Sequence, residues 1–472
     1  MTPSAIALSV IFAIVVLGSA LGFYAGARHK MDLEQWTVAG RGFGLVFVWL
    51  LMAGESYTTF SLLGASGWAY SQGGPALYIL AYMLLLFVVS FYILPPIWEI
   101  ARRYSLQTQA DFFQQRYNST SLAVAVALVG IVFIIPYLQL QLNGLGIIVE
   151  VASFEAIGRT PAMLIAFVLV ASFVFMSGVR AVAWISVLKD LLLLFVVLTV
   201  GTAVSRIYFG GVGPTFTALL RARPSHLTMP GATVDHGHAW FISTVLLTSL
   251  GGYIWPHTMG SSFTAKSSDT LRRNAVIMPL YGVTLPLIFM VGFAGILIAP
   301  GLKNGDLSLL TIVRKTFSPL FLGIVGGAGA LTAMVPAALL ILTAATLFAK
   351  NVYRPLCAPD ISDRQVARLA RAMVLVIAVI ALYFAIYSSS TLVALLLMGY
   401  AGITQLFPGV VFGLFSRRVS SMTVLSGLVV GVATAATLIL GKHDPFLGLN
   451  AGFIGLCLNL LTVGVLNLTK VC

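Results

Sequence analysis

Long apolar runs, separated by short polar segments, follow one another along nearly the whole chain. A helix that crosses the hydrocarbon core of a bilayer needs about 20 mostly apolar residues. The runs lack the strict alternation that is typical of transmembrane barrel strands. The pattern therefore predicts about thirteen transmembrane helices. They are expected at residues 4–27, 44–72, 75–101, 120–152, 161–178, 182–209, 238–265, 275–300, 318–350, 366–388, 391–415, 420–440 and 447–469.

The composition agrees with a protein whose surface faces lipid. Only 9% of the residues are charged and 59% are hydrophobic, whereas a soluble protein has roughly a quarter of its residues charged. The net charge is +13, but Lys and Arg fall mainly between the apolar runs, which indicates membrane topology rather than nucleic-acid binding. We therefore expect a multi-pass protein of a bacterial-type plasma (inner) membrane, with the lipid bilayer as its surroundings.

The basic residues also predict the orientation of the chain. No basic residue precedes the first run, and Arg28 and Lys30 follow it. This bias favours a retained helix over a cleaved signal peptide and places the N-terminus outside. With this orientation the inside loops carry a clear excess of Lys and Arg. An odd number of spans then leaves the C-terminus in the cytoplasm.

Two spans contain polar or small residues where a continuous apolar helix would be expected. They are interrupted at residues 50–59, around Glu55, and at residues 248–257, which include Pro256. Unwound backbone at mid-membrane is tolerated only where it lines a cavity. Because the two spans are five helices apart, they predict an inverted repeat of spans 2–6 and 7–11, with a binding site at its interface.

The predicted fold is thus an all-α integral membrane domain with a 5+5 inverted-repeat core. We expect a single transmembrane domain over residues 1–472. It would comprise an extra N-terminal helix at 1–30, the repeat core at 40–415 and two C-terminal helices at 420–472.

Glu55 is the only acidic residue that we place deep in this core. It lies about 11 residues into the second span, or roughly 16 Å along a helix that rises 1.5 Å per residue. A carboxylate at that depth is costly unless it is paired, protonated or hydrated. Two interpretations remain open: a role in coupling or substrate binding, and a structural carboxyl that caps the unwound helix.

Other polar residues in the spans have a structural interpretation beside a functional one. Gln141 and His257, a histidine inside the seventh span, could bind substrate or only bond neighbouring helices. For Lys189 and Asp190, near the inner end of the sixth span, we expect a local ion pair or snorkelling. Small-residue spacing predicts close helix packing in the ninth span. The glycines concerned are Gly323, Gly326, Gly327 and Gly329.

Several function classes are not supported by any motif. The sequence has no phosphate-binding loop of the GxxxxGK[ST] type and no zinc or hydrolase spacing. We therefore expect neither an enzyme nor an ATP-driven pump, and no metal or organic cofactor beyond a coupling ion. The remaining alternative outside transport is a membrane sensor or a subunit of a larger complex. The oligomeric state is not predicted.

Four segments, in the same order along the chain, resemble the sodium:solute symporter family. They are residues 40–44 (GRGFG), 141–144 (QLNG), 184–190 (WISVLKD) and the stretch from 256–258 (PHT) to Asn274. The chain is most similar to the monocarboxylate branch, which carries lactate, pyruvate, acetate or alanine and shares PHT and the later MVPAA run. The resemblance implies a LeuT-type core and alternating access. Pantothenate carriers share PHT, so another solute, such as pantothenate or an amino acid, stays open.

One departure from the family concerns the coupling ion. The resemblance implies a sodium site made of carbonyls from the broken second span and two adjacent hydroxyl residues in the ninth. Those hydroxyl positions fall on Val335 and Pro336, which offer no side-chain oxygen, although Thr332 one turn earlier could partly substitute. Sodium is a hard cation that needs oxygen ligands. We therefore expect proton coupling, with sodium coupling through a rebuilt site as the alternative.

These observations predict a secondary transporter for a small carboxylate. Its substrate would lie between spans 2, 4 and 7, where half-helix ends and nearby polar groups can bind a carboxylate. We expect Glu55 to carry the coupling proton. The expected substrate contacts are Ser56, Tyr57, Gln141, Tyr253 and His257.

Overall fold

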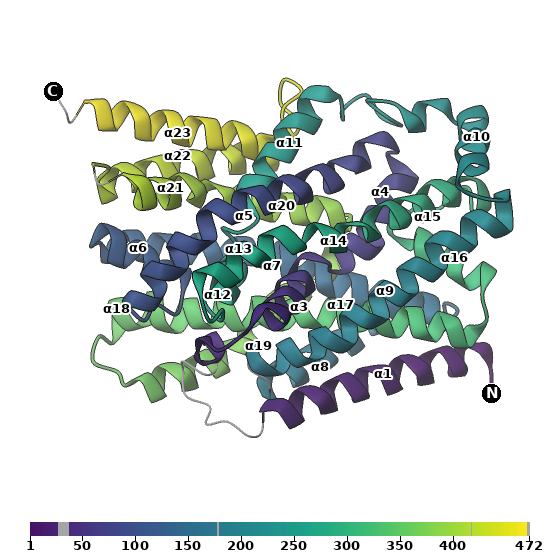
Figure 1. The fold of residues 1–472 in the computed structure, drawn as a ribbon, viewed down its shortest axis with the longest axis horizontal. Helices are drawn as coiled ribbons and strands as arrows, with labels where there is room; N and C mark the ends of the chain where they lie inside the picture. Colours follow the sequence, from purple (N-terminus) through teal and green to yellow (C-terminus); the bar gives the residue numbers. More distant parts are fainter. Residues whose placement is uncertain (27–36, 177–178, 417, 470–472) are drawn as a thin grey trace.

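The computed structural model describes residues 1–26, 37–176, 179–416 and 418–469, and this part of the chain is almost entirely helical. The long helices run roughly side by side (Figure 1). The orientation of the chain across the membrane stays a prediction, and several of the basic residues in the predicted inside segments lie outside the described residues. They are Arg28, Lys30, Arg417 and Lys470.

The apolar runs form the predicted spans. Within the described residues ten helices are long and apolar enough to cross a membrane, one further pair forms a bent span, and two apolar helices are shorter. Together they match the thirteen predicted segments. The unbroken spans are α1 (Pro3–Gly26), α5 (Tyr78–Arg103), α7 (Thr120–Ala152), α8 (Arg159–Met176), α9 (Val179–Phe209), α17 (Pro319–Thr346), α19 (Asp363–Tyr387), α22 (Ser421–Leu440) and α23 (Ala451–Leu468).

The other spans are interrupted. The second span is α3 (Leu45–Ser56) followed by the π-helical turn η2 (Phe60–Gly64) and α4 (Ala65–Ser71), with a bend of 55°. The seventh span is α11 (His238–Gly251), a turn, and α12 (Pro256–Ser262). These are the two breaks that the sequence predicted. The eighth span comprises α13 (Ser268–Ile277), α14 (Pro279–Gly282) and α15 (Thr284–Ile298), and the eleventh comprises α20 (Leu392–Ile403) and α21 (Phe407–Phe415).

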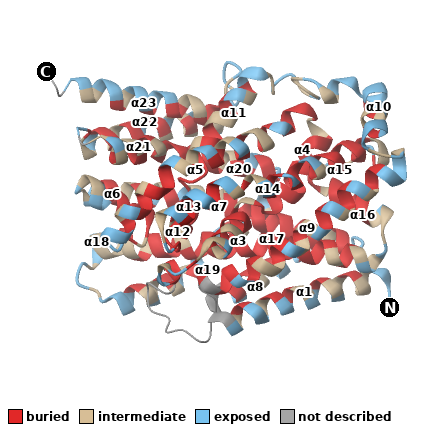
Figure 2. Cartoon of the chain, viewed as in Figure 1, coloured by how far each residue is buried: buried red, intermediate tan, exposed pale blue. Residues whose placement is uncertain are grey.

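Helix α17 forms the centre of the bundle (Figure 2). In its most apolar stretch 89% of the residues are buried, compared with 28% in α1 at the edge. The glycines of α17 let α1 approach closely: a Cβ atom on Gly327 would lie 2.6 Å from Cδ1 of Ile14, and one on Gly323 would lie 2.9 Å from the carbonyl oxygen of Ala7. The prediction of close packing at these glycines is therefore confirmed.

Short helices outside the spans were not predicted. They are α6 (Gln109–Tyr117), α10 (Val212–Ala222), α16 (Ser308–Thr316) and α18 (Arg354–Cys357). Helix α6 begins with a capping box, in which the Thr108 hydroxyl accepts from the Asp111 amide and the Asp111 carboxylate accepts from the Thr108 amide. The π-helical turn η6 (Leu347–Tyr353) follows α17 and packs against α6.

Candidate functional site

The break in the second span leaves backbone carbonyls without helical partners. Helix α3 ends at Ser56, and Tyr57 has non-helical backbone angles (φ −102°, ψ 86°). The Tyr137 hydroxyl of α7 donates to the carbonyl oxygen of Glu55 (3.2 Å), and the Ser61 hydroxyl donates to that of Ser56 (3.0 Å). One side chain from α7 and one from the same broken span thus replace the missing backbone hydrogen bonds, as a buried break requires.

Glu55 connects the two broken spans. Its side chain is 2% exposed, and the hydroxyl of Ser261, in α12, donates to Oε1. Thr258 of α12 lies beside the same carboxyl. Oε2 has no hydrogen-bond partner among the described residues. One oxygen of this carboxyl is therefore held by the partner span, while the other is open to a proton or a ligand.

A cavity lies directly beside this carboxyl. Four of the predicted site residues contribute to its wall: Glu55 and Ser56 from α3, Tyr253 from the break in the seventh span, and His257 from α12. Aromatic and apolar side chains form most of the remaining wall. They include Phe60, Tyr82, Met83, Leu86, Tyr137, Trp255, Leu396 and Tyr400.

His257 also lines a second cavity, so this residue lies in the wall between the two. The second cavity is bounded by Ser261 of α12, by Gln107 beside α6 and by Thr343 of α17. His257 is 3% exposed, and its ring packs against Tyr137 with 5.7 Å between centroids. Nδ1 finds no hydrogen-bond partner within the described parts of the chain.

The remaining two predicted contacts lie elsewhere. Gln141 of α7 is fully buried, and its Oε1 accepts from the Thr59 hydroxyl (2.7 Å) in the broken span. Tyr57 packs its ring on Tyr281, with 4.2 Å between centroids. Neither residue belongs to the wall of the central cavity, so their contact with a substrate stays a prediction.

The sequence of the chain decides its family. The profile of the sodium:solute symporter family matches residues 36–431. The chain belongs to the sodium:solute symporter family. It is similar to the uncharacterized symporter YhjB of Bacillus subtilis (strain 168), with 46% identity covering 98% of this chain and 96% of the relative. It is also similar to the monocarboxylate transport permease protein of Rhizobium johnstonii, with 29% identity covering 90% of this chain and 87% of that protein.

Solved structures show the same fold. A Na⁺-coupled sialic acid symporter, in a substrate-bound outward-open state, superposes with a TM-score of 0.81 at 16% identity, over 98% of this chain and 97% of that one. MhsT in complex with L-phenylalanine gives a TM-score of 0.56 at 13% identity, over 90% of this chain and 98% of that one. The predicted LeuT-type fold with a 5+5 inverted-repeat core is therefore confirmed.

Of the two positions where the resemblance places sodium-binding hydroxyls, Val335 lies beside the break of the second span. If Gly54 carried a Cβ atom, that atom would lie 3.5 Å from Cγ1 of Val335. Pro336 is buried in the interior of α17. The hydroxyl of Thr332 donates to the carbonyl oxygen of Ala328 in its own helix (2.7 Å). This bond uses the hydroxyl hydrogen of Thr332 and leaves the lone pairs of its oxygen.

A lysine approaches the break from the sixth span. Nζ of Lys189, in α9, donates to the carbonyl oxygens of Gly54 (3.2 Å) and Tyr57 (3.0 Å) and forms an ion pair with Oδ1 of Asp190 (2.9 Å). Lys189 is 0% exposed and Asp190 is 1% exposed. The predicted local ion pair is confirmed. The alternative of snorkelling is wrong, and so is the view of Glu55 as the only acid deep in the core.

The sequence alone did not reveal this contact with the break. Within one span, the direction of a side chain depends on the rotation of the helix, and an almost uniformly apolar sequence leaves that rotation undetermined. The sequence did contain one signal, a Lys–Asp dipeptide inside an apolar run. Two charges there are costly unless they pair with each other or with backbone carbonyls, or take part in function.

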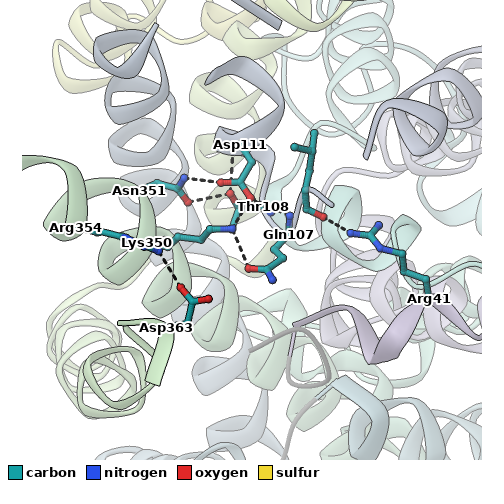
Figure 3. A network of polar contacts seen from close by, with 9 residues as sticks. Arg41, Gln107, Thr108, Asp111, Lys350, Asn351, Arg354 and Asp363 are labelled. Atoms are coloured by element: carbon teal, nitrogen blue, oxygen red, sulfur yellow. Dashed lines mark hydrogen bonds and ion pairs between the residues drawn. The ribbon is translucent and has the colours of Figure 1, made fainter. Parts of the chain in front are cut away.

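A second polar network joins α6 to the end of α17, far along the chain from the break (Figure 3). Lys350 in η6 donates to Oδ2 of Asp111 (2.8 Å) and to Gln107 (2.8 Å), while Nδ2 of Asn351 donates to Oδ1 of Asp111 (2.9 Å). Burial raises the pKa of Asp111, but Lys350 and the surrounding donors outweigh it, so the pKa lies below its ordinary value. The Asp111 carboxyl therefore stays ionised at neutral pH.

Proposed function

We propose that this symporter carries a small monocarboxylate together with a proton, and that Glu55 binds the proton. The observation that carries the proposal is the Glu55 carboxyl at the break of the second span. It lines the central cavity, accepts from Ser261 of the other broken span, and keeps one oxygen without a partner among the described residues. A carboxyl in this position can exchange a proton and sense a ligand at once.

The charges near the cavity suit this coupling. Lys189 and Asp190 form an ion pair and cancel each other, so the protonation of Glu55 sets the net charge at the break. An ionised Glu55 would repel a carboxylate ligand across a low-dielectric site. Once Glu55 is protonated, that repulsion ends and the anion can bind. The proton and the monocarboxylate then cross together without net charge, which avoids moving an unpaired charge through the bilayer.

The polar groups of the cavity suit a small carboxylate. Ser56, Tyr253 and His257 each bring a side chain that can donate a hydrogen bond to the wall of the cavity, and the rest of the wall is mainly aromatic and apolar. This combination would hold one carboxylate group and a short apolar tail. The relative named as a monocarboxylate transport permease protein supports the same class of substrate.

The proposed cycle uses the two cavities in turn. Glu55 would accept a proton from the outer side while substrate binds in the central cavity. Occlusion would follow, and His257 would then separate the substrate from the second cavity until that wall opens. This cycle assumes the predicted orientation with the N-terminus outside. It also assumes that residues 40–415 form the moving core between the extra helix at 1–30 and the two helices at 420–472.

Sodium coupling with another solute is the alternative that the family favours. The family takes its name from sodium:solute symport, and a relative named as the osmoregulated proline transporter OpuE of Bacillus subtilis (strain 168) is 26% identical. Under this alternative, sodium would drive uptake of an amino acid or pantothenate. A non-transporting sensor is disfavoured because the relatives carry the names of transporters.

Uptake into proteoliposomes tests the proposal. The purified protein would be reconstituted, and uptake of labelled pyruvate, lactate, acetate, pantothenate and proline would be followed with either a pH gradient or a sodium gradient. We expect accumulation of at least one monocarboxylate with the pH gradient alone, and competition among the monocarboxylates only. Uptake that requires the sodium gradient, or that is confined to proline or pantothenate, would contradict the proposal.

A further inference from the structure

The Lys189 ammonium lies where the broken span offers its carbonyl oxygens. Of four successive carbonyls in the break, those of residues 55 and 56 bond hydroxyl groups, while those of Gly54 and Tyr57 both accept from Nζ of Lys189 (3.2 and 3.0 Å). With Oδ1 of Asp190 at 2.9 Å, the ammonium contacts three oxygen atoms. This is the number of donors that a lysine possesses, so the group is fully satisfied.

The surroundings of this ammonium resemble a site for a small cation. Two neutral carbonyls and one carboxylate, all oxygen ligands, converge on one buried point, which is what a hard cation requires. The Tyr281 hydroxyl donates to Oδ1 of Asp190 (3.0 Å) and holds that carboxylate in place. These oxygen atoms are the partners that one buried positive charge requires, and the Lys189 ammonium supplies that charge.

The opposite side of the break fits an ammonium better than a metal ion. Val335 presents a methyl group towards Gly54. The three acceptors around Nζ are all that an ammonium needs, whereas a sodium ion takes more oxygen ligands and would gain none from Val335. The apolar contact that weakens a metal site is harmless to a lysine.

We propose that the Lys189 ammonium is a tethered cation that occupies the position in which a symporter of this family would bind sodium. The break in the second span is then held together by the protein's own side chain, and no sodium ion is needed to close it. This inference rests on the proposed proton-coupled function and explains how the chain can keep the family's broken span while using another coupling ion.

The test measures binding of cations rather than transport. The thermal unfolding temperature of the purified protein would be compared in sodium chloride and in choline chloride at equal ionic strength. We expect the wild type to show no difference. Lys189→Ala should unfold at a lower temperature, and sodium or methylammonium should restore part of the loss by filling the vacated position. Lys303→Ala, at an exposed loop lysine, serves as the control and should behave as the wild type.

A second variant keeps the test decisive if Lys189→Ala does not fold. Val335→Ser adds an oxygen ligand beside the break. With Lys189 present it should still give no response to sodium, whereas the double variant with Lys189→Ala should respond more strongly than Lys189→Ala alone. Sodium-specific stabilisation of the wild type or of Val335→Ser, or a folded Lys189→Ala that no small cation stabilises, would overturn the inference.

The outcome is separable from that of the proposed function. The unfolding measurement needs neither a substrate nor a pH gradient. Failure of monocarboxylate uptake to follow the pH gradient, in a protein that does not respond to sodium, would contradict the proposed function alone. A sodium response of the wild-type unfolding temperature would contradict the tethered cation whatever the substrate.

Discussion

The two oxygens of Glu55 have different surroundings. Oε1 accepts from Ser261, while Oε2 lacks a partner in the described structure. A purely structural cap would be expected to satisfy both oxygens, because leaving a buried acceptor unpaired costs about 1–3 kcal/mol. The geometry therefore favours a carboxyl that gains its second partner during the cycle, either as a proton or as a ligand.

The first prediction at this scale concerns His257. Replacing it with Ala should raise the KM for substrate about tenfold and change the maximal rate less, because a hydrogen-bond donor to a buried carboxylate is worth roughly 1–3 kcal/mol. Initial rates in proteoliposomes provide the measurement. His443→Ala, at an exposed histidine between α22 and α23, is the matched control. An unchanged KM in His257→Ala would remove this residue from the substrate site.

Asp306, outside the spans, gives a prediction for pH dependence. Burial raises the pKa of Asp306 to about 6, although its carboxylate accepts from the Leu392 amide (3.0 Å). The ordinary value is about 4, so the folded protein binds an extra proton between these two values. Stability should therefore fall as the pH rises from about 4 to about 6.

Asp306→Asn should remove this contribution while keeping an acceptor for the Leu392 amide. Unfolding temperatures across a pH series would show a flatter profile for Asp306→Asn than for the wild type, with the greatest gain near neutral pH. Asp235→Asn, at an exposed position, should leave the profile unchanged. Parallel profiles for wild type and Asp306→Asn would show that Asp306 does not titrate in this window.

At the scale of single residues, the sequence predicted which residues line the central cavity better than it predicted their hydrogen-bond partners. Glu55, Ser56, Tyr253 and His257 were chosen because they interrupt apolar spans, and all four line one cavity. Ser261 was missed, since a serine in a helix is common and only the packing of α12 on α3 shows that it bonds Glu55.

The broken helices join the functional elements of the bundle. Helices α3, α12, α7 and α9 meet at the break, through Glu55, Ser261, Tyr137 and Lys189. A movement of any one of these helices must therefore rearrange hydrogen bonds at the break. In the proposed cycle, this arrangement would let the substrate and the proton influence the helices that open the site.

The network around Lys350 leads us to expect that its bonds hold the second cavity closed on this side of the protein. Gln107 belongs both to the network around Lys350 and to the wall of the second cavity. Thr343 of α17 lines the same cavity. Lys350→Met should break the ion pair with Asp111 and favour opening of this side. The change would be measured as the rate at which a cysteine at position 343 reacts with a membrane-impermeant maleimide.

The labelling would use a background in which the three native cysteines are replaced by serine. A loss of ~1 kcal/mol from the closed state corresponds to about fivefold faster labelling. Lys315→Met in α16, whose ammonium donates to the carbonyl of Ile298, is the matched control and should label as the background does. Equal rates for Lys350→Met and the background would exclude a gating role for the network.

At the scale of elements the apolar pattern predicted the spans and missed the short helices. The length of an apolar run predicts a span, and a Gly, Pro or charged residue inside the run predicts a break. Helices α6, α10 and α16 have 9 to 11 residues, and at that length an amphipathic segment between spans resembles a loop. Their stability depends on packing against the bundle, which sequence periodicity does not reveal.

The whole molecule has the fold of its family, but its residues near the break of the second span depart from the sodium site that the resemblance implies. The family match over residues 36–431 and the superposition on a Na⁺-coupled symporter establish the fold. At the positions where the resemblance places sodium-binding hydroxyls, Val335 and Pro336 lack side-chain oxygens, and Lys189 brings its own charge to the break. The fold could be predicted from the sequence because it follows from spans and breaks. The contact of the Lys189 ammonium with the break could not be predicted from the sequence, because it depends on the rotation of α9.

The central claim is that Glu55 carries the coupling proton, and Glu55→Gln tests it most directly. The amide imitates the protonated carboxyl but cannot release a proton. In proteoliposomes, Glu55→Gln should still exchange labelled for unlabelled monocarboxylate across the membrane, yet it should lose accumulation driven by a pH gradient. Normal pH-driven accumulation by Glu55→Gln would contradict the account.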